Sequence, residues 1–295
     1  MISLALILLV TAVQTAAAVN PEHLVEDVRA MSAADTNPAR FDALTAMLRA
    51  RNLTFAVEPF TIDKPVGREP RTEGRNVVVT LGDGPAQIVV GAHYDAARLP
   101  DGTLSRGAVD NAASSVVLVR LAEALRKEKL PVRVKVVWFD MEELGLLGSQ
   151  KYVEAHAADR IVAMFNFDVN AYGDTVLFGP SERKENAGVR RTLLQACAAE
   201  ERSCVGFPQM PPGDDRSFVK ANVPTLSIAL LPAVEAHQVW LLMNGQPASG
   251  LAEGHTPAIL KTIHTADDTA ARIDGEAMAR TFRFALALVR NAGRS

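Results

Sequence analysis

The sequence predicts an α/β fold, a three-layer sandwich in which helices cover both faces of a central, mostly parallel mixed sheet. Strand-like and helix-like segments alternate along most of the chain, which is typical of strand–helix–strand units. The segment Val132–Phe139 is apolar on both faces, as expected of a central strand that is covered on each side. The length of 295 residues allows one large α/β domain of this kind.

The helices are predicted where apolar residues recur at three- and four-residue spacing. These segments are Pro21–Met31, Pro38–Arg51, Asp110–Lys127, Leu146–His156, Ala187–Glu200, Ser217–Ala221 and Gly275–Asn291. Asp110 is placed to cap its helix, and Pro131 marks where the helical pattern stops.

The strands are predicted at short apolar or β-branched runs between turn-forming stretches such as Gly82–Pro85. These runs are Phe55–Phe60, Asn76–Leu81, Gln87–Gly91, Val132–Phe139, Ile161–Phe167, Thr175–Phe178 and Thr225–Leu231. The stretch Pro232–Leu260 is expected to be the least regular part of the chain, and long loops of this kind in compact domains are usually functional.

The N-terminal segment has the pattern of a signal peptide. Residues 1–18 contain no charged side chain, and the apolar run Ile2–Val13 is too short to span a bilayer comfortably. We expect cleavage near Ala18–Val19, a single domain over residues 19–295, and secretion or a periplasmic location. The alternative is an uncleaved N-terminal anchor. After signal cleavage no membrane span is expected.

Charge and cysteine content narrow the possible partners and redox state. The formal net charge of −3 and the absence of a polybasic run argue against nucleic acid or anionic lipid as a partner. Cys197 and Cys204 lie close enough in sequence to form a local disulfide in an exported protein, and two reduced core thiols are the alternative. Neither cysteine has a nearby histidine or second cysteine pair, which argues against a metal or nucleophile role.

Histidine and acidic residues follow the predicted strands at the points where these strands end. His93 and Asp95, then Glu142 and Glu143, and finally Asp168 each come after a predicted strand. Ligands in open α/β sheets bind at the carboxyl ends of the strands, so we expect these side chains to meet at one edge.

Two further candidates complete this cluster: Asp110 at a predicted helix start and His264 in the loop before the last helix. Imidazole and carboxylate groups suit Zn²⁺, or Co²⁺ and Mn²⁺, and the cluster lacks the thiolates of a structural zinc site. Charge balance indicates two ions. Three carboxylate ligands would carry three negative charges, which two divalent cations and one hydroxide balance. A single ion would leave a net negative cluster.

In combination, these motifs resemble those of the M28 family of zinc peptidases, of the aminopeptidase Y and bacterial leucyl aminopeptidase type. The motifs are His-x-Asp from His93, Asp-Asn-Ala from Asp110, Glu-Glu-x-Gly from Glu142, the Asp168 that follows an Asn-rich strand end, and His-Thr-x-x-Asp from His264. The resemblance runs from about Asn76 to Thr269. It implies the phosphorylase/hydrolase-like zinc-exopeptidase fold and two zinc ions per chain.

The resemblance also implies a role for each residue. His93 and Asp168 would complete one zinc site, Glu143 and His264 would complete the other, and Asp110 would bridge them. Glu142 would be the general base. Asp95 would lie behind His93 and fix the tautomer of its imidazole ring.

Several residues near these motifs are assigned plainer roles. His255 superficially repeats the His264 pattern but lacks the trailing Asp-Asp-Thr, so it is expected to be a loop or substrate-pocket residue. The remaining histidines are expected on the surface or in the core, and Trp240 in packing. Asp267 and Asp268 are expected to cap a turn or the last helix. Arg216 replaces a histidine that many family members carry, which predicts an altered pocket that favours an acidic group.

The function predicted from these residues is that of a zinc-dependent exopeptidase, an aminopeptidase that acts on a peptide or aminoacyl substrate. A glutaminyl cyclase with a single zinc is the nearest alternative, because it resembles this family in fold and in much of the ligand set. A non-catalytic receptor or scaffold is a third hypothesis, against which the complete set of ligands and base argues.

Overall fold

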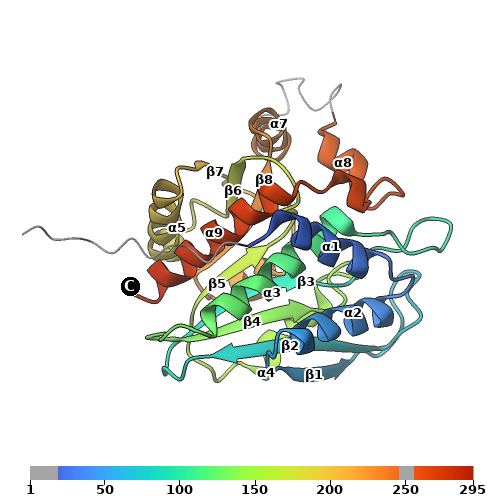
Figure 1. Ribbon diagram of the computed structural model, residues 1–295, viewed down its shortest axis with the longest axis horizontal. Helices are drawn as coiled ribbons and strands as arrows, with labels where there is room; N and C mark the ends of the chain where they lie inside the picture. The colour runs from blue at the N-terminus through green and yellow to red at the C-terminus, as the bar shows by residue number, and fades with distance from the viewer. Residues whose placement is uncertain (1–18, 246–255, 295) are drawn as a thin grey trace, which may run out of the picture.

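The computed structural model describes residues 19–245 and 256–294, which form a mixed eight-stranded sheet between layers of helices (Figure 1). The strands lie in the order β1-β2-β4-β3-β5-β8-β6-β7. Their bounds are β1 Ala56–Thr61, β2 Glu73–Leu81, β3 Gln87–His93, β4 Arg133–Phe139, β5 Ile161–Phe167, β6 Thr175–Gly179, β7 Ser203–Gly206 and β8 Thr225–Leu231. The central strands β4, β3, β5 and β8 are parallel, as is the pair β6 and β7, whereas β1 with β2, β2 with β4 and β6 with β8 are antiparallel. The predicted α/β class is therefore confirmed.

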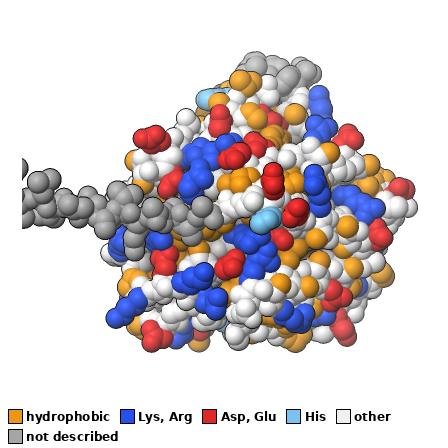
Figure 2. All heavy atoms as spheres, in the orientation of Figure 1, with side chains coloured by type: hydrophobic (Ala, Val, Ile, Leu, Met, Phe, Trp, Pro, Cys, Tyr) orange, Lys and Arg blue, Asp and Glu red, His pale blue; other side chains and the backbone are white. Residues whose placement is uncertain are grey.

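The longer helices cover the two faces of this sheet. On one face lie α1 Pro21–Ser32, α2 Asn37–Ala50, α3 Ala113–Leu125, α5 Ala187–Ala199 and α9 Gly275–Ala292. On the other face lie α4 Leu147–Ala155 and α6 Asp215–Lys220. Figure 2 shows acidic and basic side chains interspersed over the face that α1, α3 and α9 cover, as expected of a solvent-exposed layer.

Alternation along the central strands explains why both faces are covered. Val77 and Val79 of β2 belong to the large core under α1, α3 and α9, whereas Val78 belongs to a smaller core under α4 and α6. The β3 strand repeats this arrangement, with Val90 in the large core and Val89 in the small one. A sheet that buries apolar side chains on both sides needs a helical layer on each.

The starts of the outer helices follow local capping rules. The side chain of Asn20 accepts a hydrogen bond from the backbone of Glu22 at the start of α1, and Asp274 accepts two at the start of α9. Each such cap satisfies backbone N–H groups that the first helical turn leaves unpaired. The positions of these two helices agree with the expectation from sequence.

The segment Pro232–Leu260 differs from the expectation of irregular chain. Its described part contains α7 Ala233–Asn244, which contacts β6 and β8, and α8 Ala258–Thr262, where the backbone N–H of Ile259 donates to Glu235 of α7. The short strand β7 was also not predicted. The expected helix from Asp110 begins only at Ala113, because Asp110 and Asn111 have non-helical backbone angles, so Asp110 does not cap it.

A disulfide joins Cys197 of α5 to Cys204 of β7, which decides between the two states left open by the sequence. The bond ties the end of a helix to an edge strand and restricts the unfolded chain. Among the described residues, no helix has the length and apolarity needed to cross a membrane. The predicted signal peptide lies outside the described residues.

Candidate metal centre

Three neighbouring parallel strands bring the predicted residues to one edge of the sheet. His93 is the last residue of β3, Asp168 directly follows β5, and Glu142 and Glu143 follow β4 by a short turn. Because β4, β3 and β5 are adjacent and parallel, their carboxyl ends open at the same edge. This placement agrees with the expectation from the sequence.

Asp110 lies between the two histidines and contacts both. Its Oδ1 lies 3.0 Å from Nε2 of His93, and its Oδ2 lies 3.1 Å from Nε2 of His264. Nε2 of His264 also lies 2.9 Å from Oε2 of Glu143, and Nε2 of His93 lies 3.6 Å from Oδ1 of Asp168. The structure thus brings together two three-residue clusters that share Asp110, each with its potential ligand atoms within 4.8 Å of one another.

The donor atoms of these clusters fit a divalent metal. Oε1 of Glu143 and Oδ1 of Asp168 are buried and have no hydrogen-bond partner among the described residues. A buried anionic oxygen without a partner is costly, and a cation would satisfy it. Imidazole nitrogens with carboxylate oxygens are a donor set that zinc accepts. A third possible group, formed by His93, Glu142 and Glu143, overlaps the first two.

The electrostatics of the site show an excess of negative charge. Burial and the neighbouring carboxylate of Asp110 raise the pKa of Glu143 to about 7. Hydrogen bonds to Asp110 and Glu143 raise the pKa of His264 to about 11. Burial lowers the pKa of His93, but the nearby carboxylates, Glu142 first, outweigh it and raise that pKa well above its usual value. Positive charge at this position would stabilise ionised carboxylates beside neutral imidazoles.

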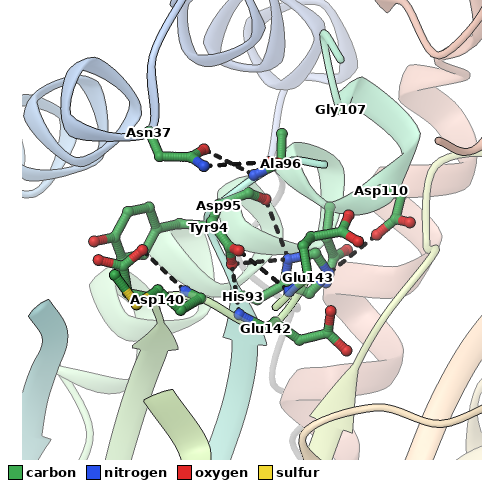
Figure 3. Close-up of polar contacts among 12 residues, drawn as sticks. Asn37, His93, Tyr94, Asp95, Ala96, Gly107, Asp110, Asp140, Glu142 and Glu143 are labelled. Atoms are coloured by element: carbon green, nitrogen blue, oxygen red, sulfur yellow. Dashed lines mark hydrogen bonds and ion pairs between the residues drawn. The ribbon is translucent and has the colours of Figure 1, made fainter. Parts of the chain in front are cut away.

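Asp95 holds the turn that carries the two glutamates. Its carboxylate accepts hydrogen bonds from the backbone N–H groups of Glu142 and Glu143, at 3.1 Å and 3.2 Å (Figure 3). Oδ1 of Asp95 also lies 3.4 Å from Nδ1 of His93, and the backbone carbonyl of Asp95 lies 3.2 Å from the same nitrogen. The fully buried Asp95 thus acts through these neighbours, and it does not line the cavity.

Asp268 has a role that sequence reasoning missed. It is buried, and its carboxylate accepts hydrogen bonds from the backbone N–H groups of Val109 and Asp110, at 2.6 Å and 3.2 Å. It therefore fastens the His264 loop to the Asp110 segment. The sequence predicts that Asp268 caps a turn or the last helix, and the last helix is capped by Asp274 instead. Its place as the last residue of the His-Thr-x-x-Asp motif is the signal that could have identified it.

Three residues at or beside the site have left-handed backbone although none is glycine. They are Met141, with φ 56°, Val169, with φ 58°, and His264, with φ 57°. Such a conformation is unfavourable for side chains of this size, above all for β-branched valine, and costs about 1–3 kcal/mol. Residues in this conformation cluster where tertiary contacts position functional groups.

The sequence profile of peptidase family M28 matches residues 76–289, which is most of the chain. The chain belongs to this family. A probable leucine aminopeptidase of Arthroderma benhamiae is 26% identical over 216 residues, which cover 68% of this chain and 51% of that protein. The chain thus spans about half the length of this relative.

Two solved structures share the M28 fold of this chain. The glutaminyl cyclase of Fimbriiglobus ruber has a TM-score of 0.73 and 16% identity, over 92% of this chain and 95% of that one. The zinc aminopeptidase BSAP of Bacillus subtilis has a TM-score of 0.71 and 14% identity, over 92% and 95%. At these identities the likeness shows the fold alone. The family and fold class predicted from the sequence are confirmed, and the chain is placed among metallo-hydrolases.

In this M28 protein, a cavity of about 510 Å³ opens beside the two clusters. The side chains of Asp110, Glu142, Glu143, Asp168 and His264 line one side of it. Its other walls are largely apolar and come from β6, β8 and the chain around α7 and α8, with Leu177, Ala229, Leu231, Val239, Ile259 and Ile263 among them. Arg216 is exposed on α6 and does not line the cavity, so the structure does not support the expected preference for an acidic group.

The other histidines lie away from the clusters or outside the described residues. His255 lies outside the described residues. His23 and His237 are exposed, on α1 and α7. His156 forms ion pairs with Glu58 and Asp159.

Proposed function

We propose that this protein is a zinc-dependent aminopeptidase that holds two zinc ions and removes apolar residues from peptide N-termini. The observation that carries the proposal is the position of Asp110, whose two carboxylate oxygens each lie about 3 Å from a different histidine. One carboxylate that faces two imidazoles is suited to bridging two cations. The names of the relatives support an aminopeptidase over other hydrolases.

In this proposal the clusters seen in the structure become the two metal positions. His93, Asp110 and Asp168 would hold one zinc, and Asp110, Glu143 and His264 would hold the other. Bound zinc would supply Lewis-acid chemistry, which polarises a carbonyl group and makes water more acidic. Asp95 would keep Glu142 and Glu143 in place through their backbone N–H groups.

Glu142 would be the general base. Its carboxylate lines the cavity, and burial raises its pKa well above its usual value. A carboxylate with a raised pKa can take a proton from the attacking water and later release it. The water oxygen bonds to the carbonyl carbon, the amide C–N bond breaks, and Glu142 delivers the proton to the leaving amine.

The apolar cavity would receive the side chain of the N-terminal residue. Among the described residues that line it, the charged groups are Glu142 and the members of the two clusters, so an acidic or basic side chain against the apolar walls would lose its hydration without gaining a partner there. Burying an apolar side chain against these walls is favourable. Substrates with large apolar first residues are therefore favoured.

Zinc content and product analysis test the proposal together. The expected result is two zinc ions per chain by elemental mass spectrometry, with chelator-sensitive hydrolysis of leucyl anilide. One zinc per chain with formation of pyroglutamyl ends from glutaminyl peptides would instead support a glutaminyl cyclase, the function of the Fimbriiglobus ruber relative in fold. Activity on N-blocked substrates alone would contradict an aminopeptidase, and activities unchanged by chelation would contradict a metal enzyme.

Filling the cavity is expected to change substrate choice. Ala229 of β8 lines the cavity, so Ala229→Phe places a ring where a bulky substrate side chain would lie. We expect kcat/KM for leucyl anilide to fall about 10-fold or more, since loss of apolar contacts in a pocket has effects of this size. Alanyl anilide, measured on the same variant, serves as the control and should change much less. An equal loss for both substrates would show that the side chain binds elsewhere.

We also propose that residues 1–18 form a cleaved signal peptide and that residues 19–295 form one domain in the periplasm or outside the cell. The Cys197–Cys204 disulfide supports export, because such bonds persist in oxidising compartments.

A further inference from the structure

Arg40 of α2 is a fully buried guanidinium directly behind the proposed metal site. Its three nitrogens donate hydrogen bonds to backbone carbonyls: Nε to Tyr94 at 2.6 Å, one terminal nitrogen to Arg106 at 2.7 Å and the other to Gly107 at 3.1 Å. A buried arginine that donates hydrogen bonds to carbonyls of two separate chain segments links those segments to each other.

The two segments are those that carry the metal-facing residues. Tyr94 lies between His93 and Asp95 at the end of β3, and Gly107 lies three residues before Asp110. Arg40 therefore fixes the distance between the segment that carries His93 and the segment that carries Asp110. Across this distance Nε2 of His93 and Oδ1 of Asp110 lie 3.0 Å apart.

Asn37, one turn earlier on α2, fastens the same strand exit. Its side chain accepts a hydrogen bond from the backbone N–H of Ala96 at 2.9 Å and donates one to the Ala96 carbonyl at 3.2 Å (Figure 3). The segment around Gly107 also packs closely against its neighbours. A Cβ at Gly107, whose φ is 51°, would lie 2.7 Å from the Asp110 carbonyl oxygen and 3.3 Å from the Arg40 side chain.

Charge adds a second contribution. Burial lowers the pKa of Arg40 to about 10, against the raising effect of nearby carboxylates, those of Asp95, Asp268, Asp110 and Glu143. Arg40 therefore stays cationic at neutral pH and offsets part of the negative charge that the site carries when it lacks metal. A buried cation is costly to maintain, and here each of the three guanidinium nitrogens donates to a backbone carbonyl.

We propose that Arg40 is a positioning residue for the metal site. Through three hydrogen bonds to backbone carbonyls it holds the His93 and Asp110 segments at the spacing that lets Asp110 face both histidines. The inference rests on the proposed metal function. It gives α2, which contributes no residue to the clusters or the cavity, a role in metal affinity through the segments that Arg40 holds.

Arg40→Lys separates the bonds from the charge. Lysine keeps the cation but offers a compact ammonium in place of a planar fork, so it cannot hold three carbonyls in this geometry. We expect the zinc affinity of the folded variant to fall about 10- to 100-fold, which is typical when a group that orients metal ligands is lost. Affinity is measured by competition with a chromophoric zinc chelator, and folding by circular dichroism of the same metal-free sample.

Arg51→Lys is the matched control. Arg51 follows the other end of α2, is also mostly buried, and binds the Asp27 carboxylate at 2.6 Å and the Met47 carbonyl at 3.0 Å. It is expected to lose thermal stability with unchanged zinc affinity. A purely structural role for Arg40 predicts the same behaviour in Arg40→Lys, and parent-like zinc affinity in that folded variant overturns the inference. Equal affinity losses in both variants overturn it too.

Asn37→Ala decides the matter if Arg40→Lys does not fold. It removes the two hydrogen bonds between the Asn37 side chain and the Ala96 backbone and leaves the buried charge of Arg40 in place. A fall in zinc affinity supports the positioning of the metal site by α2, whereas unchanged affinity contradicts it. The two proposals fail separately. If the parent enzyme binds no zinc, the proposed function is refuted together with this inference. If the parent binds zinc and the variants bind it with the same affinity, the inference alone is refuted.

Discussion

Glu142→Gln is expected to retain zinc and to lose hydrolysis of leucyl anilide by about 10³-fold. Glutamine has the shape of glutamate but cannot take a proton from water, and general-base catalysis contributes roughly 10²- to 10⁴-fold. The two clusters that share Asp110 do not include Glu142, so their donor atoms are unchanged. The measurement is kcat with zinc content determined on the same preparation.

The control for this variant is Glu154→Gln, which removes an acidic group from the exposed end of α4, where the carboxylate pairs with Lys151. It should leave kcat and zinc content unchanged. Cleavage by Glu142→Gln at the parent rate would show that another group accepts the proton. Loss of zinc from this variant would instead indicate that Glu142 is a ligand, as the overlapping group with His93 and Glu143 allows.

Asp110→Asn has the second large expected effect, a loss of zinc from both positions and of measurable hydrolysis. Asp110 is buried, and each of its oxygens faces one histidine. An amide has almost the same size but lacks the negative charge, and its nitrogen cannot act as a ligand. We expect the affinity for both ions to fall more than about 100-fold. This loss exceeds the one typical of removing a group that only hydrogen-bonds to a metal ligand.

Asp168→Asn is the matched comparison, because Asp168 belongs only to the cluster of His93. Zinc content should fall toward one ion per chain in Asp168→Asn and toward none in Asp110→Asn, after dialysis against the same dilute chelator. Equal zinc contents in the two variants would contradict a bridging role for Asp110.

The sheet could be predicted well because its central strands are short, apolar and bounded by turn residues. The strand predicted from Gln87 and the one predicted from Ile161 are present, and the residues at their carboxyl ends converge as expected. This success has a simple physical basis. A strand buried on both faces shows its burial directly in its composition.

The elements that were missed depend on tertiary contacts or lack a clear period. In α7, Val234 and Leu241 are exposed although they are apolar, so no polar face marks the helix. The segment before α3 is held by Asp268, which binds the Asp110 backbone from a position far along the chain. The sequence around Asp110 contains no trace of that contact.

The candidate site shows the same division. Residues whose side chains face the clusters belong to motifs that the sequence displays, such as the pair Glu142 and Glu143. Arg40 and Asp268 act instead on backbone carbonyls and N–H groups, which nearly every residue type possesses. For Arg40, neither the sequence of its partners nor their spacing identifies the contacts before the fold is known. For Asp268, its place at the end of the His-Thr-x-x-Asp motif is a signal, but the motif does not name the backbone groups that it binds.

The unequal exposure of the two histidines has a consequence for the kinetics of metal exchange. The His93 side chain is 2% exposed and that of His264 is 55% exposed. With both positions filled as proposed, we expect the ion beside His264 to exchange with the medium faster than the ion beside His93. Enzyme that has lost part of its zinc during purification is then expected to retain the ion at the buried position and to lack the ion at the outer one.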